Sequence, residues 1–218
     1  MQTTRTLSLG RNRGDYGQQT DRELEINLTE FMIWTGPRVS EAMAIAWEDV
    51  DLVAGTVEIR RARVAGQYRV TKTRRSTRKV KLLTPGLRGL QAQARFTQHH
   101  GPELIEVVDR DNRTVREQRA RCVFHNSATG EPYRSSNVLR HGWWITHLGK
   151  AGVRQRGPNT CQHAFASQML SSGIATPERI ADQMGHTSTA MIFKHYAKWT
   201  SEDGPDVVSL LNRALKLS

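Results

Sequence analysis

The sequence predicts an α+β domain that is mostly helical and contains a small three-stranded antiparallel sheet. Apolar residues recur at helical spacing in several long segments, while a short stretch before residue 60 alternates apolar and polar side chains. Of the 218 residues, 37% are hydrophobic, which is enough for one well-filled core. This length suits one globular domain, so we expect a single core.

The N-terminal part divides into a tail and the first helices. Residues 1–20 are rich in Thr, Arg, Gly and Gln without periodicity, so we interpret them as a tail or the remnant of a linker. We expect the domain to occupy residues 21–218. Its first helix is predicted from Asp21 to the Gly36-Pro37 pair, and a second over residues 40–47.

Three short strands are predicted to form the sheet. Thr56–Ile59 alternates apolar and polar residues, and further strands are expected around Tyr68–Thr71 and Lys79–Leu83. The helical pattern returns after Thr84. For the very polar segment Pro102–Arg121 we expect a surface helix or an ordered loop.

Capping signals indicate that the second half of the chain is mainly helical. Ser135 or Ser136 suits the start of one helix, and another is expected over residues 163–172. Thr176-Pro177 begins a third, which Gly185 ends. The last two helices are expected to begin at Ser188 and Pro205.

Charge and composition restrict the class of partner. The formal net charge is +11 and the sequence pI is 10.3, which favours a polyanionic partner such as nucleic acid over a membrane surface. No stretch approaches the roughly 18–20 consecutive apolar residues that cross a bilayer. Without a secretion signal, and with Cys122 and Cys161 as the only cysteines, we predict a protein of the reducing cytoplasm.

One segment contains ten cations and no acidic residue. These cations are Arg60, Arg61, Arg63, Arg69, Lys72, Arg74, Arg75, Arg78, Lys79 and Lys81. Cations on one hairpin repel one another unless an anion lies across them. The alternative is a solvated basic face, but such faces usually include Glu or Asp. We therefore predict phosphate binding that weakens with salt, by a log–log slope of about −0.9 per contact.

A histidine, a tyrosine and an arginine are candidates for chemistry. His186 follows a turn glycine, and Tyr196 lies on the next predicted helix. An imidazole and a phenol on a basic surface suit nucleophilic attack on a DNA phosphate. Arg38 precedes a predicted helix N-terminus, where backbone N–H groups also favour phosphate. Taken singly, each has an ordinary alternative as a capping, loop or packed residue.

Six motifs together carry a resemblance. In chain order they are Thr35-Gly36-Pro37-Arg38-Val39-Ser40-Glu41, Trp47-Glu48-Asp49-Val50-Asp51, Thr71-Lys72-Thr73 with Ser76 and Arg78, His163-Ala164-Phe165-Ala166-Ser167, Met184-Gly185-His186 and His195-Tyr196-Ala197-Lys198-Trp199. As a set, from Asp21 to Trp199, this sequence resembles the catalytic domain of the tyrosine recombinases, in the branch of phage and genomic-island integrases.

The resemblance implies a cut in DNA that uses no metal, ATP or other cofactor. A tyrosine attacks a DNA phosphate, leaves a 3′-phosphotyrosyl link and releases a 5′-hydroxyl that later attacks a partner strand. Tyr196 would be the nucleophile and Arg38 a stabiliser of the pentacoordinate phosphorane. Lys72 would protonate the leaving 5′-oxygen, and His186 would hydrogen-bond a phosphate oxygen. His163 falls in a catalytic motif, and the DNA-binding residues would include Arg74, Arg75 and Arg78.

One motif departs from the family pattern. A histidine or tyrosine, two variable residues and a second arginine normally precede His163, but Asn159-Thr160-Cys161-Gln162 stands here. Gln162 occupies the arginine position and Asn159 the aromatic or imidazole position. A glutamine carries no charge, and loss of a phosphate-facing arginine costs about 10³–10⁵ in rate. We therefore expect a slow or inactive recombinase domain that still binds DNA, unless the second arginine comes from elsewhere.

Two other function classes compete with this one. Gln162 favours a non-catalytic DNA-binding protein that retains the recombinase fold. An RNA-binding module is the weaker alternative, because aromatic residues make up only 6% of the chain.

The expected partner is double-stranded DNA, with further recombinase protomers once on DNA. The family usually places a helical core-binding domain before this one, and the chain starts too late to contain it. We therefore expect an excised fragment or a truncated gene product, monomeric without DNA.

Overall fold

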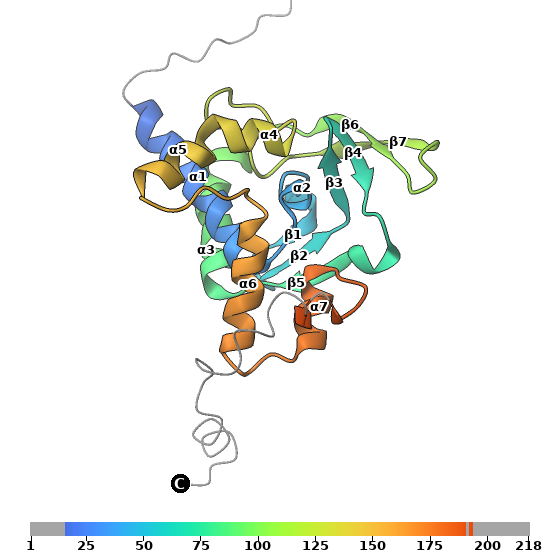
Figure 1. Cartoon of the computed structure of the whole chain (residues 1–218). Helices are drawn as coiled ribbons and strands as arrows, with labels where there is room; N and C mark the ends of the chain where they lie inside the picture. The colour runs from blue at the N-terminus through green and yellow to red at the C-terminus, as the bar shows by residue number, and fades with distance from the viewer. Residues whose placement is uncertain (1–15, 191, 194–218) are drawn as a thin grey trace, which may run out of the picture.

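The computed structural model describes residues 16–190, 192 and 193, in which the longest helices lie beside two small sheets (Figure 1). Helix α1 (Tyr16–Thr35) is the central element, and α3 (Thr84–Thr97) and α6 (Thr160–Ser171) pack against it. The predicted fold class is confirmed. Helix α1 begins before the predicted Asp21, and the division into residues 1–20 and 21–218 stays a prediction.

The first sheet is antiparallel and has three strands in the order β1-β2-β5. These strands are β1 (Val50–Asp51), β2 (Thr56–Ile59) and β5 (Arg78–Lys81). Val57 lies opposite Val80, and both are buried with Ile59. The side-chain alternation that predicted β2 therefore marks its core-facing side. The third strand is β1, rather than the predicted strand near Tyr68.

The second sheet was not expected. It has the order β3-β4-β6-β7 and contains β3 (Arg61–Val64), β4 (Gln67–Val70), β6 (Glu103–Val108) and β7 (Val115–Ala120). Strands β4 and β6 are parallel, and the other pairs are antiparallel. The prediction of a surface helix or loop over Pro102–Arg121 is wrong, because this segment forms β6 and β7, and Ile105 and Val107 of β6 are buried beside Tyr68 of the earlier strand β4.

Shorter elements complete the fold. They are α2 (Val39–Ala42), 3-10 turns at Trp47–Asp49 and Arg74–Ser76, α4 (Ser136–Leu139), a π-helical turn at Arg140–Trp144, α5 (Ile145–Lys150) and α7 (Pro177–Met184). The helix predicted over residues 40–47 ends at Ala42, because Trp47 N–H donates to the Arg121 carbonyl and Ala46 bridges Cys122. Ser135 and Thr176 cap α4 and α7 as expected.

The main core lies between α1, α3 and the first sheet. Leu28, Phe31 and Met32 of α1 are fully buried, and the rings of Phe31 and Phe124 lie 5.2 Å apart. Both cysteines are free and buried. No helix of the described residues is long and apolar enough to cross a membrane. Tyr196 and the helix predicted from Pro205 lie outside these residues.

Carboxylates from other elements neutralise part of the basic segment. Asp49 is almost fully buried, with Oδ1 2.6 Å from Nε of Arg60. Its Oδ2 accepts a short hydrogen bond from the buried guanidinium of Arg61. The expectation that these cations need an external anion is therefore wrong for this pair, because their anion comes from an earlier turn.

Replacing Asp49 with Asn tests this buried pairing. Asp49→Asn keeps the shape but leaves the Arg61 guanidinium buried and unpaired, so the free energy of unfolding should fall by about 3–5 kcal/mol. Chemical denaturation measures it, with Glu58→Gln on the exposed face of β2 as the matched control. Equal stability of the two variants would contradict the assignment.

Candidate functional site

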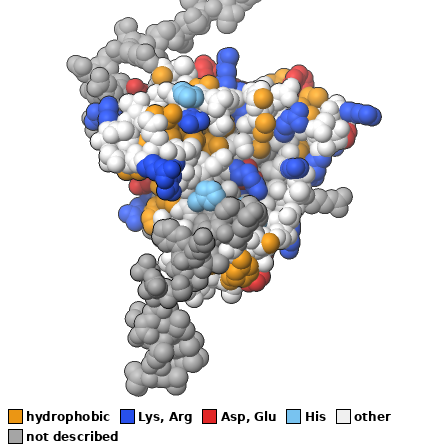
Figure 2. Space-filling model, viewed as in Figure 1, with side chains coloured by type: hydrophobic (Ala, Val, Ile, Leu, Met, Phe, Trp, Pro, Cys, Tyr) orange, Lys and Arg blue, Asp and Glu red, His pale blue; other side chains and the backbone are white. Residues whose placement is uncertain are grey.

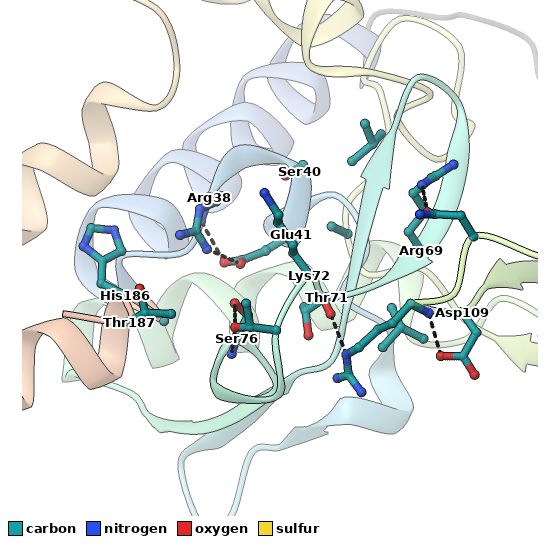
Figure 3. A pocket seen from close by; sticks show the side chains of 17 residues that line it. Arg38, Ser40, Glu41, Arg69, Thr71, Lys72, Ser76, Asp109, His186 and Thr187 are labelled. Atoms are coloured by element: carbon teal, nitrogen blue, oxygen red, sulfur yellow. Dashed lines mark hydrogen bonds and ion pairs between the residues drawn. The ribbon is translucent and has the colours of Figure 1, made fainter. Parts of the chain in front are cut away.

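Three of the predicted site residues line one cleft. Arg38 stands at the start of α2, Lys72 lies in the loop after β4, and His186 follows α7. The cleft has a volume of about 920 Å³. Figure 3 shows Lys72 extending from its loop toward the side of the cleft that holds Arg38. Residues separated by more than a hundred positions thus reach one cavity large enough for a phosphate.

Arg38 is held by a carboxylate on its own helix. Helix α1 ends before Gly36, whose φ of +74° lets the chain turn sharply. Glu41 then accepts hydrogen bonds from the Arg38 backbone N–H (3.0 Å) and from its Nη1 (2.8 Å). The carboxylate is buried, while the Arg38 side chain is 39% exposed. Arg38 is therefore fixed at one edge of its guanidinium and open to the cleft.

Arg78 is a second partner of Glu41. Its Nη2 donates to Oε2 of Glu41 (3.0 Å), its Nε to the Gln183 carbonyl (2.6 Å) and its Nη1 to the Ser76 carbonyl (2.9 Å). The side chain is only 7% exposed. These contacts favour a structural role for Arg78, which joins β5 to α7, over the predicted contact with DNA.

The other two predicted DNA-binding residues differ from Arg78. Arg75 is exposed, donates to the Thr187 carbonyl at 2.9 Å and lies 3.9 Å from Asp182. Its charge is accessible beside the cleft. The side chain of Arg74 lies outside the described part of the structure. DNA contact by any of the three stays a prediction.

His186 is half-buried and faces cations. Gly185 ends α7 in the left-handed conformation, and His186 follows it. Burial lowers the pKa of His186 below its ordinary value of 6.5, and the charges of Arg38 and Arg78 lower it further. Its Nδ1 is buried and finds no hydrogen-bond partner among the described residues. A neutral imidazole at neutral pH follows.

Asn159 and Gln162 contact the backbone that carries Arg38. Oδ1 of Asn159 accepts from the Val39 N–H at 3.2 Å, and Nε2 of Gln162 donates to the Gly36 carbonyl at 3.1 Å. Neither is among the described residues that line the cleft. The two side chains lie behind the Arg38 turn and hold it from α6.

His163 is close to the site but does not line the cleft. It is exposed on α6, one residue after Gln162, and its charge contributes to the lowered pKa of His186. A catalytic role for His163 stays a prediction.

The cleft is positively charged overall. Arg69, Arg110 and Lys72 line it together with Arg38, whereas its lining carboxylates are Glu41 and Asp109. Glu41 is shared by two arginines, and Asp109 lies 3.0 Å from Arg116. Lys and Arg side chains also recur across the face seen in Figure 2. An anion is the ligand that this arrangement favours.

Sequence reasoning missed two residues here. The pattern Ser40-Glu41 suits the first turn of a helix, but Glu41 also binds the distant Arg78. Arg110 lay in the segment assigned to a surface helix or loop, and nothing in the local sequence marks it. Both depend on contacts between distant parts of the chain.

Comparison with known sequences identifies a family. The sequence model of the phage integrase family matches residues 16–202. Prophage integrase IntR of Escherichia coli (strain K12) is 34% identical over 193 residues, covering 87% of this chain and 46% of the relative. Tyrosine recombinase XerC of Roseiflexus sp. (strain RS-1) is 28% identical over 180 residues, covering 77% and 46% respectively. The chain therefore spans about half the length of these relatives.

Solved structures share the fold. The Tn1549 transposon integrase in complex with circular intermediate DNA superposes with a TM-score of 0.62 at 18% sequence identity. The match covers 93% of this chain and 62% of that one.

The lowered pKa of His186 predicts its titration. Its NMR midpoint should lie below 6.5 and rise in Arg38→Ala, because one nearby positive charge is removed. Since the folded pKa is below the unfolded one, the contribution of His186 to stability is lost as pH falls through 6.5 and lower. His186→Gln assigns the resonance. A midpoint at or above 6.5 would contradict the described environment.

Proposed function

Because the chain belongs to the phage integrase family, we propose that it cuts and rejoins DNA in site-specific recombination. The proposed reaction is strand exchange through a 3′-phosphotyrosine, with Tyr196 as nucleophile. The observation that carries the proposal is the meeting of Arg38, Lys72 and His186 in one positively charged cleft. Support for Tyr196 comes from its sequence motif alone.

The proposed chemistry exchanges one phosphodiester for another. The Tyr196 oxygen bonds to phosphorus and gives its proton to solvent water. The bond from phosphorus to the 5′-oxygen breaks, and Lys72 gives that oxygen a proton. Arg38 offers donors to the equatorial oxygens, where negative charge develops. The phosphotyrosyl bond keeps the energy of the original linkage, so a 5′-hydroxyl can reverse the step.

The neutral state of His186 suits this role. A neutral imidazole donates one hydrogen bond to a phosphate oxygen without a charge that must be neutralised. An anion in the cleft would also offset the charges of Arg38 and Arg78 that lower its pKa. Phosphate binding should therefore raise the pKa of His186.

We infer that Gln162 impairs the cut. The family pattern places a cationic donor there, whereas here a neutral amide donates to the Gly36 carbonyl and carries no charge. Asn159 is likewise engaged by the Val39 N–H. Of the two motifs that contain Arg38 and Gln162, only the first then supplies a phosphate-facing arginine. We expect the rate of DNA cleavage to fall by about 10³–10⁵.

The same position favours the second candidate function. A DNA-binding protein without cleavage would keep the basic cleft and tolerate Gln162. Covalent capture separates the two functions, because only the recombinase leaves protein attached to DNA.

We also propose how the domain works with other parts. The proposed partners are double-stranded DNA and further protomers bound to the same DNA. In the absence of DNA the protein is proposed to be a monomer, and its proposed location is the cytoplasm. The chain spans about half the length of its relatives. A core-binding domain on a separate or preceding segment would enclose the DNA together with this domain.

Removal of the Tyr196 hydroxyl tests the nucleophile. Tyr196→Phe should abolish covalent protein–DNA complexes on a nicked half-site, because no oxygen remains to attack phosphorus, while DNA affinity stays nearly unchanged. Denaturing gels and equilibrium binding measure the two quantities. Tyr16→Phe is the matched control and should behave like the unsubstituted chain. An adduct that persists in Tyr196→Phe would assign the nucleophile to another residue.

Restoring a cation tests the impairment. Gln162→Arg should raise the rate of covalent complex formation by about 10³ or more. The guanidinium can still donate to the Gly36 carbonyl, so the turn keeps its support. Gln162→Met, of similar length but without charge or donor, should give no gain. No increase with Gln162→Arg would refute the assignment of this position.

A further inference from the structure

The loop that carries Lys72 is held from outside by the hairpin of the second sheet. Arg110 lies two residues after the end of β6 and reaches across to residues 71–77. Its Nε donates to the Thr71 carbonyl at 3.0 Å, and its Nη2 donates to Oγ1 of Thr77 at 2.9 Å. One guanidinium therefore bonds both ends of the loop.

The Thr71 carbonyl belongs to the peptide group that leads into Lys72. A hydrogen bond to this oxygen fixes the orientation of that peptide plane, and with it the direction in which Lys72 leaves the backbone. The hydroxyls of Thr71 and Thr77 lie 2.7 Å apart and close the base of the loop. Figure 3 shows Lys72 extending into the cleft directly after Thr71.

Arg110 is itself presented by an ordered turn. Asp111 accepts hydrogen bonds from the Arg113 N–H and from the N–H and hydroxyl of Thr114. Asn112 adopts φ +57° and accepts from Nη1 of Arg69 on β4 at 2.7 Å. The turn is thus tied to the second sheet, so Arg110 acts from a fixed base rather than from a free loop.

The rest of the loop has fewer external ties. Thr73 and Ser76 bond mainly to each other, and Arg75 donates to the Thr187 carbonyl. Lys72 is exposed. Beside the lysine, the Thr71 N–H donates to the Arg60 carbonyl at 3.2 Å, while the Thr71 carbonyl, in the peptide group shared with Lys72, is held by Arg110.

We propose that Arg110 is a positioning residue that sets the orientation of Lys72 through the Thr71 carbonyl and the Thr77 hydroxyl. It has no part in the bond exchange itself. It places the ammonium where the proposed leaving oxygen is protonated, so this inference rests in part on the proposed function. A lysine at position 110 has no planar fork and cannot hold both oxygens in this geometry.

Limited trypsin digestion of the full chain without DNA tests the contact independently of activity. Arg110→Ala should speed cleavage after Lys72 and Arg75 by about 5- to 10-fold, because local opening of the loop becomes easier. Arg113→Ala removes the same charge from the same turn and should leave these rates unchanged. Equal rates in Arg110→Ala and the unsubstituted chain would refute the contact.

A half-site with sulfur in place of the 5′-bridging oxygen tests the role in positioning. A thiolate leaves without a proton because the thiol pKa is about 8.5, so this substrate makes a general acid unnecessary. On the oxygen substrate, Arg110→Ala should slow covalent complex formation about 10-fold, with Arg110→Lys intermediate. On the sulfur substrate, Arg110→Ala and Lys72→Ala should form the covalent complex as fast as the unsubstituted chain. Arg113→Ala should match the unsubstituted chain on both substrates.

The outcomes separate the two proposals. If sulfur rescues Lys72→Ala but not Arg110→Ala, the positioning role fails and the proposed function stands. If sulfur rescues neither, the acid role of Lys72 fails. If Arg110→Ala weakens DNA binding and leaves the loop unchanged, Arg110 is a phosphate contact and the inference is overturned. If the chain forms no covalent complex, the digestion rates decide.

Discussion

A buried carboxylate between two arginines is the constraint on which the site depends. Glu41 accepts from Arg38 on one side and Arg78 on the other, and Arg78 in turn bonds the Gln183 carbonyl of α7. Helix α2, strand β5 and the end of α7 are thereby joined at one point. Glu41 and Arg78 are both buried, and removing one of them leaves an uncompensated charge, at a cost of about 3–5 kcal/mol. Arg38 and His186 owe their common cleft to this junction.

The back of the site shows how a change in side-chain chemistry can be absorbed by the scaffold. At the two positions where the resemblance predicts an aromatic or imidazole side chain and a second arginine, Asn159 and Gln162 hydrogen-bond the backbone on either side of Arg38. A Cβ added at Gly36 would lie 2.5 Å from the Phe165 ring, so the turn and α6 are already in close contact. A short amide side chain spans this distance and stabilises the turn without reaching the cleft.

Local patterns predicted those elements whose stability is local. The strand at residues 56–59, the caps at Ser135 and Thr176 and the end of α7 at Gly185 all follow from neighbouring residues, and the structure contains each of them. The predictions failed where a partner is remote. Strand β7 is too polar to be recognised alone, and β6 exposes Leu104 while it buries Ile105 and Val107 beside Tyr68 of the distant strand β4. Helix α2 ends early for the same reason, since Trp47 and Ala46 pair with residues 121 and 122.

The sequence by itself determined the fold class, the basic character and the motifs that contain Arg38, Lys72 and His186. These features are encoded in composition and in short, ordered spacings along the chain. Only the tertiary structure decided which cations face the cleft and which are neutralised inside the protein, as Arg61 and Arg78 are. It also decided that Arg110 reaches the loop of Lys72. Ion pairs and hydrogen bonds act over a few ångströms in space, and the sequence separation of their partners gives no information on that distance.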